Sequence, residues 1–188
     1  ADARREIEYA PAGAIVGRTG LFTALGRLAG GATDVTAAID AFANAVDANP
    51  NDPAAHKYLA GALLQQDRAN EGFIEFVAAL LIDPLDADAH AGIGRIQLDA
   101  GKFADAAEAL RRAVELTPDQ TEVRYALATA LARLGKTQEA AQEFDRVEDA
   151  QRRALAERRR TMSLDVLKEE AALRATEGQY DKAIELYE

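Results

Sequence analysis

Apolar residues recur along this chain with two periods. Within blocks of about 13 residues they are spaced by about 3.6 residues, which predicts amphipathic helices. The blocks come in pairs, and each pair recurs every 34 residues, a distance marked by Pro50, Pro84 and Pro118. With proline at position 32, repeats begin at Thr19, Pro53, Ala87 and Thr121. Positions 1–14 and 18–30 of each repeat are then expected to form two helices.

The same residue types fall at the same positions of successive repeats. Position 24 is bulky and holds Phe42, Phe76, Leu110 and Phe144. Position 8 is small and holds Gly26, Ala60, Gly94 and Ala128. Small residues also fill position 20 (Ala38, Gly72, Ala106, Ala140), and position 27 holds Ala45, Ala79, Ala113 and Val147. Small side chains allow two helices to approach closely, and the bulky position fills the space beside the crossing.

Residues that start and stop helices lie at the ends of the blocks. Proline at position 32 ends the second helix because it lacks an N–H donor. Asp52 followed by Pro53 predicts a helix start, with a capping carboxylate and proline in the first turn. Gly101, Gly135 and Gly178 stand at position 15, where glycine closes a first helix.

This pattern resembles the tetratricopeptide repeat, which also has a period of 34 residues. The resemblance covers Thr19 to Glu188. It implies an all-α fold, a right-handed α-α superhelix in which antiparallel helix pairs stack as a solenoid. Residues 1–18 lie outside the repeat and are expected to form a separate N-terminal arm.

A fifth repeat begins late. The segment from Gly178 to Ala183 matches Gly101 to Ala106, which places its start at Leu164, nine residues later than the period requires. The insertion lies near residues 152–163, where Arg152 replaces the proline, so the preceding helix is expected to continue to about Arg159. Glu170 stands at position 7, where the first four repeats hold the apolar residues Leu25, Leu59, Ile93 and Leu127. The fifth repeat reaches only position 25, and we expect a longer natural chain or a partner to cover it.

Charge and composition narrow the function. The net charge of −10 disfavours nucleic acid and anionic membrane surfaces as partners. No apolar run approaches the length of a membrane span, and the first residues are too polar for a signal peptide. Cysteine is absent, so disulfides and thiolate chemistry are excluded. The compartment stays open between a bacterial cytoplasm and a periplasm or cell envelope.

Candidate catalytic chemistry is not found. His56 and His90 both stand at position 4, 34 residues apart, so they lie about one helix layer, roughly 10 Å, from each other. That separation is too large for a shared metal ion. Phosphate-binding loops and catalytic or calcium-binding motifs are also missing. We therefore expect a protein that is not an enzyme and needs no cofactor or metal.

The family resemblance implies a binding site for a peptide or protein segment. In such proteins, positions 2, 5, 9, 12 and 13 of the first helices line a concave groove. Here the candidates are Arg27, Lys57, Leu64, Gln65, Arg95, Leu98, Asp99, Tyr125, Thr129 and Arg133, and further groove positions hold Asp88, Ala91, Glu122 and Ala132. Gly61 and Gly92 replace the asparagines with which relatives clamp chaperone C-termini, so we do not expect binding to Hsp70 or Hsp90 tails.

A second, basic surface is predicted in the insertion. It consists of Arg152, Arg153, Arg158, Arg159 and Arg160. These arginines could dock an acidic partner, or they could belong to a solvated helix with ion pairs to Glu148, Asp149, Glu169 and Glu170. The leading interpretation of the chain is an adaptor that binds a protein segment. Two alternatives stay open, namely self-assembly through the fifth repeat and an interaction arm of a larger enzyme or envelope complex.

Overall fold

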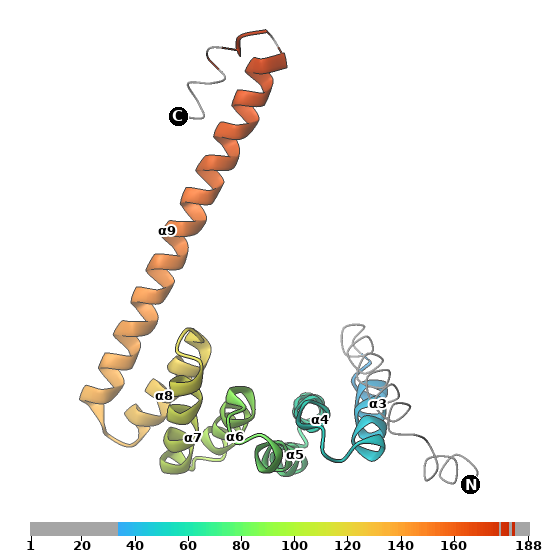
Figure 1. Ribbon diagram of the computed structural model, residues 1–188. Coiled ribbons are helices and arrows are strands. Elements are labelled where there is room, and N and C mark those ends of the chain that lie inside the picture. The colour runs from blue at the N-terminus through green and yellow to red at the C-terminus, as the bar shows by residue number, and fades with distance from the viewer. Residues whose placement is uncertain (1–33, 177, 181, 183–188) are drawn as a thin grey trace. The chain divides into compact units, whose positions relative to one another are not determined.

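The computed structural model describes residues 34–176, 178–180 and 182, and within these residues every regular element is a helix (Figure 1). The predicted N-terminal arm, the first helix of repeat one and Arg27 lie outside the described residues. The helices are α3 (Val35–Ala48), α4 (Pro53–Gln65), α5 (Ala69–Ile82), α6 (Ala87–Asp99), α7 (Phe103–Leu116), α8 (Thr121–Arg133) and α9 (Thr137–Thr176).

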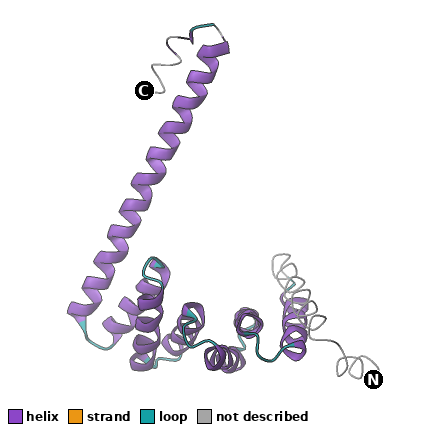
Figure 2. Cartoon of the chain, viewed as in Figure 1, coloured by secondary structure: helices purple, strands orange, loops and turns teal. Residues whose placement is uncertain are grey.

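Helices that follow one another in sequence also pack against one another. Within the unit Ala1–Glu143, contacts join α3 with α4, α4 with α5, and so on to α7 with α8. Short loops connect them (Figure 2). From α3 to α8, each end lies within one residue of the position that the repeat predicts. The predicted all-α solenoid of antiparallel helix pairs is therefore confirmed.

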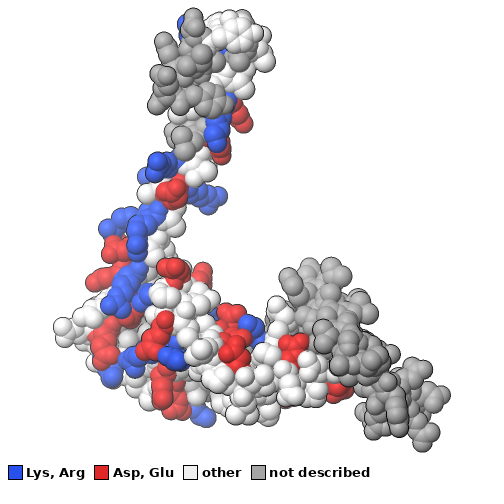
Figure 3. Space-filling model, viewed as in Figure 1, with Lys and Arg blue, Asp and Glu red and all other residues white. Residues whose placement is uncertain are grey.

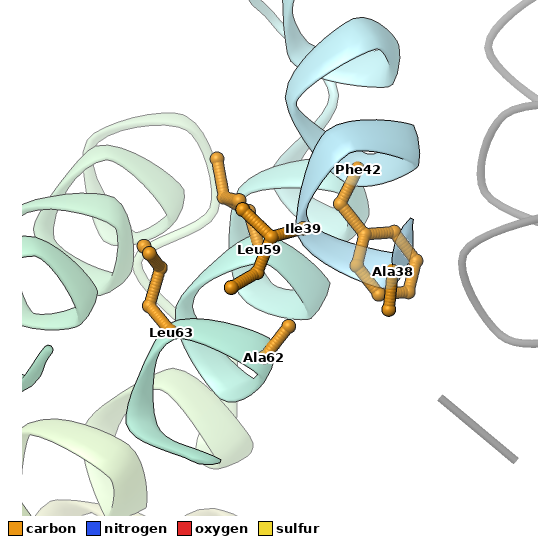
Figure 4. Packing of buried hydrophobic residues seen from close by; sticks show 6 residues of the cluster. All are labelled: Ala38, Ile39, Phe42, Leu59, Ala62 and Leu63. Atoms are coloured by element: carbon orange, nitrogen blue, oxygen red, sulfur yellow. The ribbon is translucent and has the colours of Figure 1, made fainter. Parts of the chain in front are cut away.

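The core alternates small and large side chains, as the repeat requires. Figure 4 shows one cluster, in which Ala38, Ile39 and Phe42 of α3 meet Leu59, Ala62 and Leu63 of α4. A second cluster joins α4, α5 and α6 through Ala60, Phe76, Ala79, Ala89 and Ile93. The alanines at the crossings are fully buried, so the helices approach as closely as their backbones allow.

Two glycines of α6 make room for bulky residues. A Cβ atom at Gly92 would overlap the ring of Phe76, and one at Gly94 would overlap the side chain of Leu110. Gly94 thus serves the predicted small position 8. Gly92, which stands where relatives have a clamp asparagine, also accommodates the ring at position 24 of the preceding repeat.

Helix ends follow the predicted signals. The carboxylate of Asp52 accepts hydrogen bonds from the N–H groups of Ala54 and Ala55, with Pro53 in the first turn. Gly101, Gly135 and Gly178 have φ angles of 74°, 75° and 77°, the left-handed conformation that glycine adopts without strain. In each of these three turns, and in the turn at Asp67, the next residue donates its N–H to the carbonyl five residues earlier, as Lys102 does to Gln97.

In the C-terminal unit, Phe144–Glu188, the predicted helix end near Arg159 is absent. We expected a helix ending near Arg159 and a new helix from Leu164, but α9 is a single helix of 40 residues that continues to Thr176. Its end still follows the fifth repeat, because Thr176 is position 13, where α6 and α8 also end, and Gly178 follows in the left-handed conformation. The insertion is therefore helix, because no proline or glycine interrupts it.

Candidate functional site

The predicted groove residues that the structure describes lie on the first helices α4, α6 and α8. Their exposure divides them into two groups. Gln65, Arg95, Asp99, Tyr125 and Arg133 are exposed, and Lys57, Leu64, Leu98 and Thr129 are half-buried. Ala91, which was expected to face the groove, is only 5% exposed and belongs to the buried side of α6. Polar contacts between side chains show which parts of α4, α6 and α8 lie next to one another.

Lys57 joins α4 to the start of α6. Its ammonium lies 2.9 Å from a carboxylate oxygen of Asp86 and 3.1 Å from one of Asp88. Burial by itself would lower the pKa of Lys57, but the hydrogen bonds to the two carboxylates outweigh it and raise that pKa above its usual value. Lys57 is thus already neutralised by the protein, which sequence position alone did not reveal.

Asp88 extends this contact toward α8. The hydrogen bond from Lys57 is the main reason why the pKa of Asp88 is lowered, and Arg95 adds a favourable charge. The side-chain amide of Gln120, the residue before α8, also lies 3.4 Å from Asp88. Polar contacts therefore connect the beginnings of α4, α6 and α8, and place equivalent faces of the first helices side by side.

The other end of this surface carries cations and apolar groups. The guanidinium of Arg133 lies 5.8 Å from the ring centroid of Phe103, a cation–π contact that orients it. Arg95 is exposed and makes no hydrogen bond within the described part of the chain. The ring of Tyr125 is 57% exposed, and Leu98 is half-buried. Cationic and apolar side chains are thus available together on α6 and α8.

Position 4 has a structural role. The Nε2 atom of His56 lies 3.0 Å from the carbonyl oxygen of Pro50, and Nε2 of His90 lies 3.1 Å from that of Pro84. In repeat four, Arg124 donates to the carbonyl of Pro118 at 2.8 Å. In repeats two to four, the position-4 side chain therefore binds the carbonyl of the preceding proline. No group of three metal-ligating side chains occurs among the described residues.

Repeat three differs beside its histidine. Nδ1 of His56 lies 2.6 Å from Glu75, and Arg124 lies 2.6 Å from Glu143, but the corresponding residue in repeat three is Ala109. Position 11, which holds buried Leu63 and Leu131 in its neighbours, holds Gln97. A cavity of about 420 Å³ opens here and is lined by His90, Ile93, Gln97, Glu108, Ala109, Arg111, Arg112 and Glu115.

Gln97 contributes a buried polar atom to this cavity that has no hydrogen-bond partner. Its Oε1 atom is buried without a hydrogen-bond partner, alone in this respect among the described side chains. The repeat alignment contained the signal for this cavity, since both Gln97 and Ala109 depart from the residues at their positions. The positions that all repeats share do not contain this signal.

The predicted basic surface lies on α9 and is exposed throughout. Arg152 lies 2.8 Å from Glu148 and 3.4 Å from Asp149, as the solvated-helix interpretation expects. Glu170 instead lies 3.0 Å from Arg174, and Arg158, Arg159 and Arg160 form no ion pair within the residues described. Figure 3 shows the Lys and Arg side chains of this helix interspersed with acidic ones.

The comparisons with known proteins agree with the fold. A family model of the tetratricopeptide repeat matches residues 23–91 and 91–154, and the chain belongs to this family. A curated relative, the "Small glutamine-rich tetratricopeptide repeat-containing protein 2" of Mycosarcoma maydis, is 29% identical over 112 residues. That match covers 60% of this chain and 32% of the relative, so the chain spans about a third of the protein that it matches.

Solved structures show the same fold at low sequence identity. The crystal structure of MamA protein is 16% identical, with a TM-score of 0.65 over 90% of this chain and 88% of that one. YrrB, described as a TPR protein with an unusual peptide-binding site, is 19% identical, with a TM-score of 0.63 over 88% of this chain and 80% of that one. The first TPR of Spaghetti (RPAP3), bound to the HSP90 peptide SRMEEVD, is 18% identical, with a TM-score of 0.62 over 63% of this chain and 94% of that one.

None of the helices in the described part of the chain combines the length and the apolar character that crossing a bilayer requires. From the exposure and contacts given above, the surface of α4, α6 and α8 is the candidate site. The α6–α7 cavity is a separate feature.

Proposed function

We propose that the chain is a non-catalytic scaffold that binds a peptide or protein segment across the first helices α4, α6 and α8. The observation that carries this proposal is the joint exposure of Arg95, Arg133 and Tyr125 at groove positions, although neighbouring positions of the same helices are buried. Exposed aromatic and arginine side chains are the groups that contribute most to protein interfaces. Peptide binding by the neighbours YrrB and Spaghetti supports the proposal by analogy.

The charges on this surface favour an acidic segment. Lys57 is already neutralised by Asp86 and Asp88, so the cations left for a partner are Arg95 and Arg133. A segment that places carboxylates near these two arginines and an apolar side chain near Tyr125 would complement the surface. Arginine binds carboxylates through two parallel hydrogen bonds, which gives geometric selectivity as well as attraction.

The test is a double variant, Arg95→Glu with Arg133→Glu. Affinity capture from the source cell followed by mass spectrometry first identifies a partner, whose binding is then titrated. We expect the double variant to weaken binding about tenfold or more, because charge repulsion replaces attraction. The helical circular dichroism should stay unchanged, and Arg153→Glu with Arg160→Glu on α9 is the charge-matched control, because it also exchanges two exposed arginines for glutamates. Equal affinity of the variant and the original chain would refute the groove model.

A second candidate function is the interaction arm of a larger enzyme or envelope complex. It is favoured by the observation that the curated relative is about three times longer than the segment matched here. The sequence of the full-length gene product tests it directly. A neighbouring catalytic domain would support this candidate, and a complete gene without one would exclude it.

A further inference from the structure

Four large apolar side chains of α9 are exposed in a single row. Leu155, Met162, Val166 and Leu173 are 51%, 62%, 58% and 59% exposed. They are separated by seven, four and seven residues, a spacing that places them on one line along a helix. We refer to these four residues as the α9 apolar row. Such a continuous exposed row is typical of an interaction surface.

Two residues of the row occupy positions that earlier repeats bury. In the register that starts at 164, Val166 is at position 3 and Leu173 at position 10. The residues at position 3 in the three preceding repeats, Ala55, Ala89 and Val123, are at most 1% exposed. Position 3 and position 10 residues such as Ala89 and Ala62 belong to clusters shared with the preceding helix. In α9 no turn intervenes, and this face stays uncovered.

The preceding repeat offers no matching apolar face. In α5, Val77 and Leu80 at positions 25 and 28 pack against the cluster that joins α5 to α6. The corresponding residues in α9 are Asp145 and Glu148, both exposed. Stacking the row against these carboxylates would bury charge without a partner, which is costly. The α9 apolar row therefore requires another occupant.

The sequence of α9 is complementary to itself in the antiparallel direction. If two copies cross with residue 164 of each at a two-fold axis, Leu155 lies opposite Leu173 and Met162 opposite Val166. The same register places Arg159 opposite Glu169. We propose that α9 is a homodimerisation surface on which a second copy of this chain binds antiparallel through the α9 apolar row. A two-fold interface uses the same surface on both subunits, as this register does.

The spacing of the seam supports this register. Residues 155, 159, 162, 166, 169 and 173 follow one another in alternating steps of four and three, the spacing of a coiled-coil seam. Arg159 and Glu169 are the two charged members of the seam. They are ten residues apart, about 15 Å along one helix, and so do not reach each other within a chain. In the dimer both find a partner of opposite charge.

The charged pair also explains why the occupant is a second copy in this one orientation. A parallel pair in register would place Arg159 opposite Arg159 and Glu169 opposite Glu169, and both contacts would be repulsive. Polar residues within a coiled-coil seam commonly fix orientation and register at some cost in stability. Because each chain contributes only four apolar side chains, the interface is at the small end of the range, and we expect a dimer that dissociates in the micromolar range.

This inference does not depend on the proposed groove, because the row lies on α9 and the groove on α4, α6 and α8. The test is sedimentation velocity of the full chain over a range of concentrations. Arg159→Glu or Glu169→Arg alone should raise the dissociation constant about tenfold or more, because like charges then face each other at two places. The double swap, Arg159→Glu with Glu169→Arg, should restore dimerisation to within about threefold, because the pair is only reversed.

Arg160→Glu serves as the matched control. It makes the same charge change one residue away, about 100° around the helix from the row, and should leave the dissociation constant unchanged. A chain that stays monomeric at all concentrations overturns the proposal. So does a double swap as weak as either single variant. Circular dichroism of each variant checks that α9 is still helical.

Cross-linking tests the antiparallel register, and the chain has no native cysteine to interfere. We expect a mixture of Leu155→Cys and Leu173→Cys chains to form a disulfide-linked heterodimer under mild oxidation. Leu155→Cys alone should not cross-link, because its two copies would be about 27 Å apart along the seam, at opposite ends of it. Efficient self-cross-linking of Leu155→Cys would show a parallel pair and overturn the proposal.

Discussion

At the scale of single residues, a substitution within the repeat changes what its neighbours can bind. In repeats two to four, the side chain at position 4 binds the carbonyl of the preceding proline, but among these three only His56 and Arg124 also have a glutamate partner. His90 faces Ala109 and the cavity instead. The repeat itself thus indicates which side chain is missing, and this gives a prediction.

Ala109→Glu should supply His90 with the carboxylate that Glu75 supplies to His56. The spacing is the same, since each pair is 19 residues apart, and the cavity leaves room for the longer side chain. We expect the free energy of unfolding to rise by about 0.5–1 kcal/mol, a value at the low end because the site is partly open to solvent. Urea unfolding followed by circular dichroism measures it.

The control is Ala109→Gln, which adds the same bulk without the charge. If the glutamate variant is no more stable than the glutamine variant, a carboxylate at position 109 forms no stabilising contact with His90. The position-4 pairs would then contribute little to the repeat.

At the scale of elements, the turns between paired helices follow one design with one exception. Gly101, Gly135 and Gly178 have left-handed backbone conformations at position 15, but Asp67 holds the same position with φ of 58°. A side chain in this conformation is strained, although aspartate tolerates it better than most residues. The turn between α4 and α5 is therefore the one with the least favourable residue.

Asp67→Gly should relieve this strain and raise the free energy of unfolding by about 0.5–1 kcal/mol. The reverse change, Gly101→Ala, should lower it by about 1 kcal/mol. A Cβ atom at Gly101 would meet no neighbour within 4 Å, so any loss reflects backbone conformation alone. Urea unfolding of both variants checks the prediction, and a stabilising Gly101→Ala change would contradict it.

The helices of the solenoid could be predicted from the sequence because their limits depend on local signals. Pro53, Gly101 and Gly135 each act within one turn of the backbone, and the structure places the helix ends beside them. The candidate site was less predictable. Repeat position indicates which face a residue occupies, but the pairing of Lys57 with Asp86 depends on a long side chain reaching the cap of another helix. No periodicity encodes such a contact.

At the scale of the whole chain, the solenoid and α9 follow different rules. The second helices of repeats two and three end two residues before Pro84 and Pro118, and a new helix starts after each proline. In repeat four the corresponding residue is Arg152, which lies within α9. The sequence did reveal the missing proline and a longer helix. It did not reveal that this helix would continue into the first helix of the fifth repeat. A missing stop signal shows that a helix continues, but it does not show at which later residue the helix ends.

Restoring the proline should divide α9. Arg152→Pro removes the N–H group that bonds to the carbonyl of Glu148 in a regular helix, and its ring collides with the preceding turn. We expect backbone amides of residues 149–156 to lose protection in hydrogen exchange measured by mass spectrometry, while residues 87–133 keep theirs. Arg152→Ala is the control, because it removes the ion pairs to Glu148 and Asp149 but leaves the helix intact. Unchanged protection in the proline variant would mean that α9 is not one continuous helix at this position, since a regular helix cannot absorb proline without losing that bond.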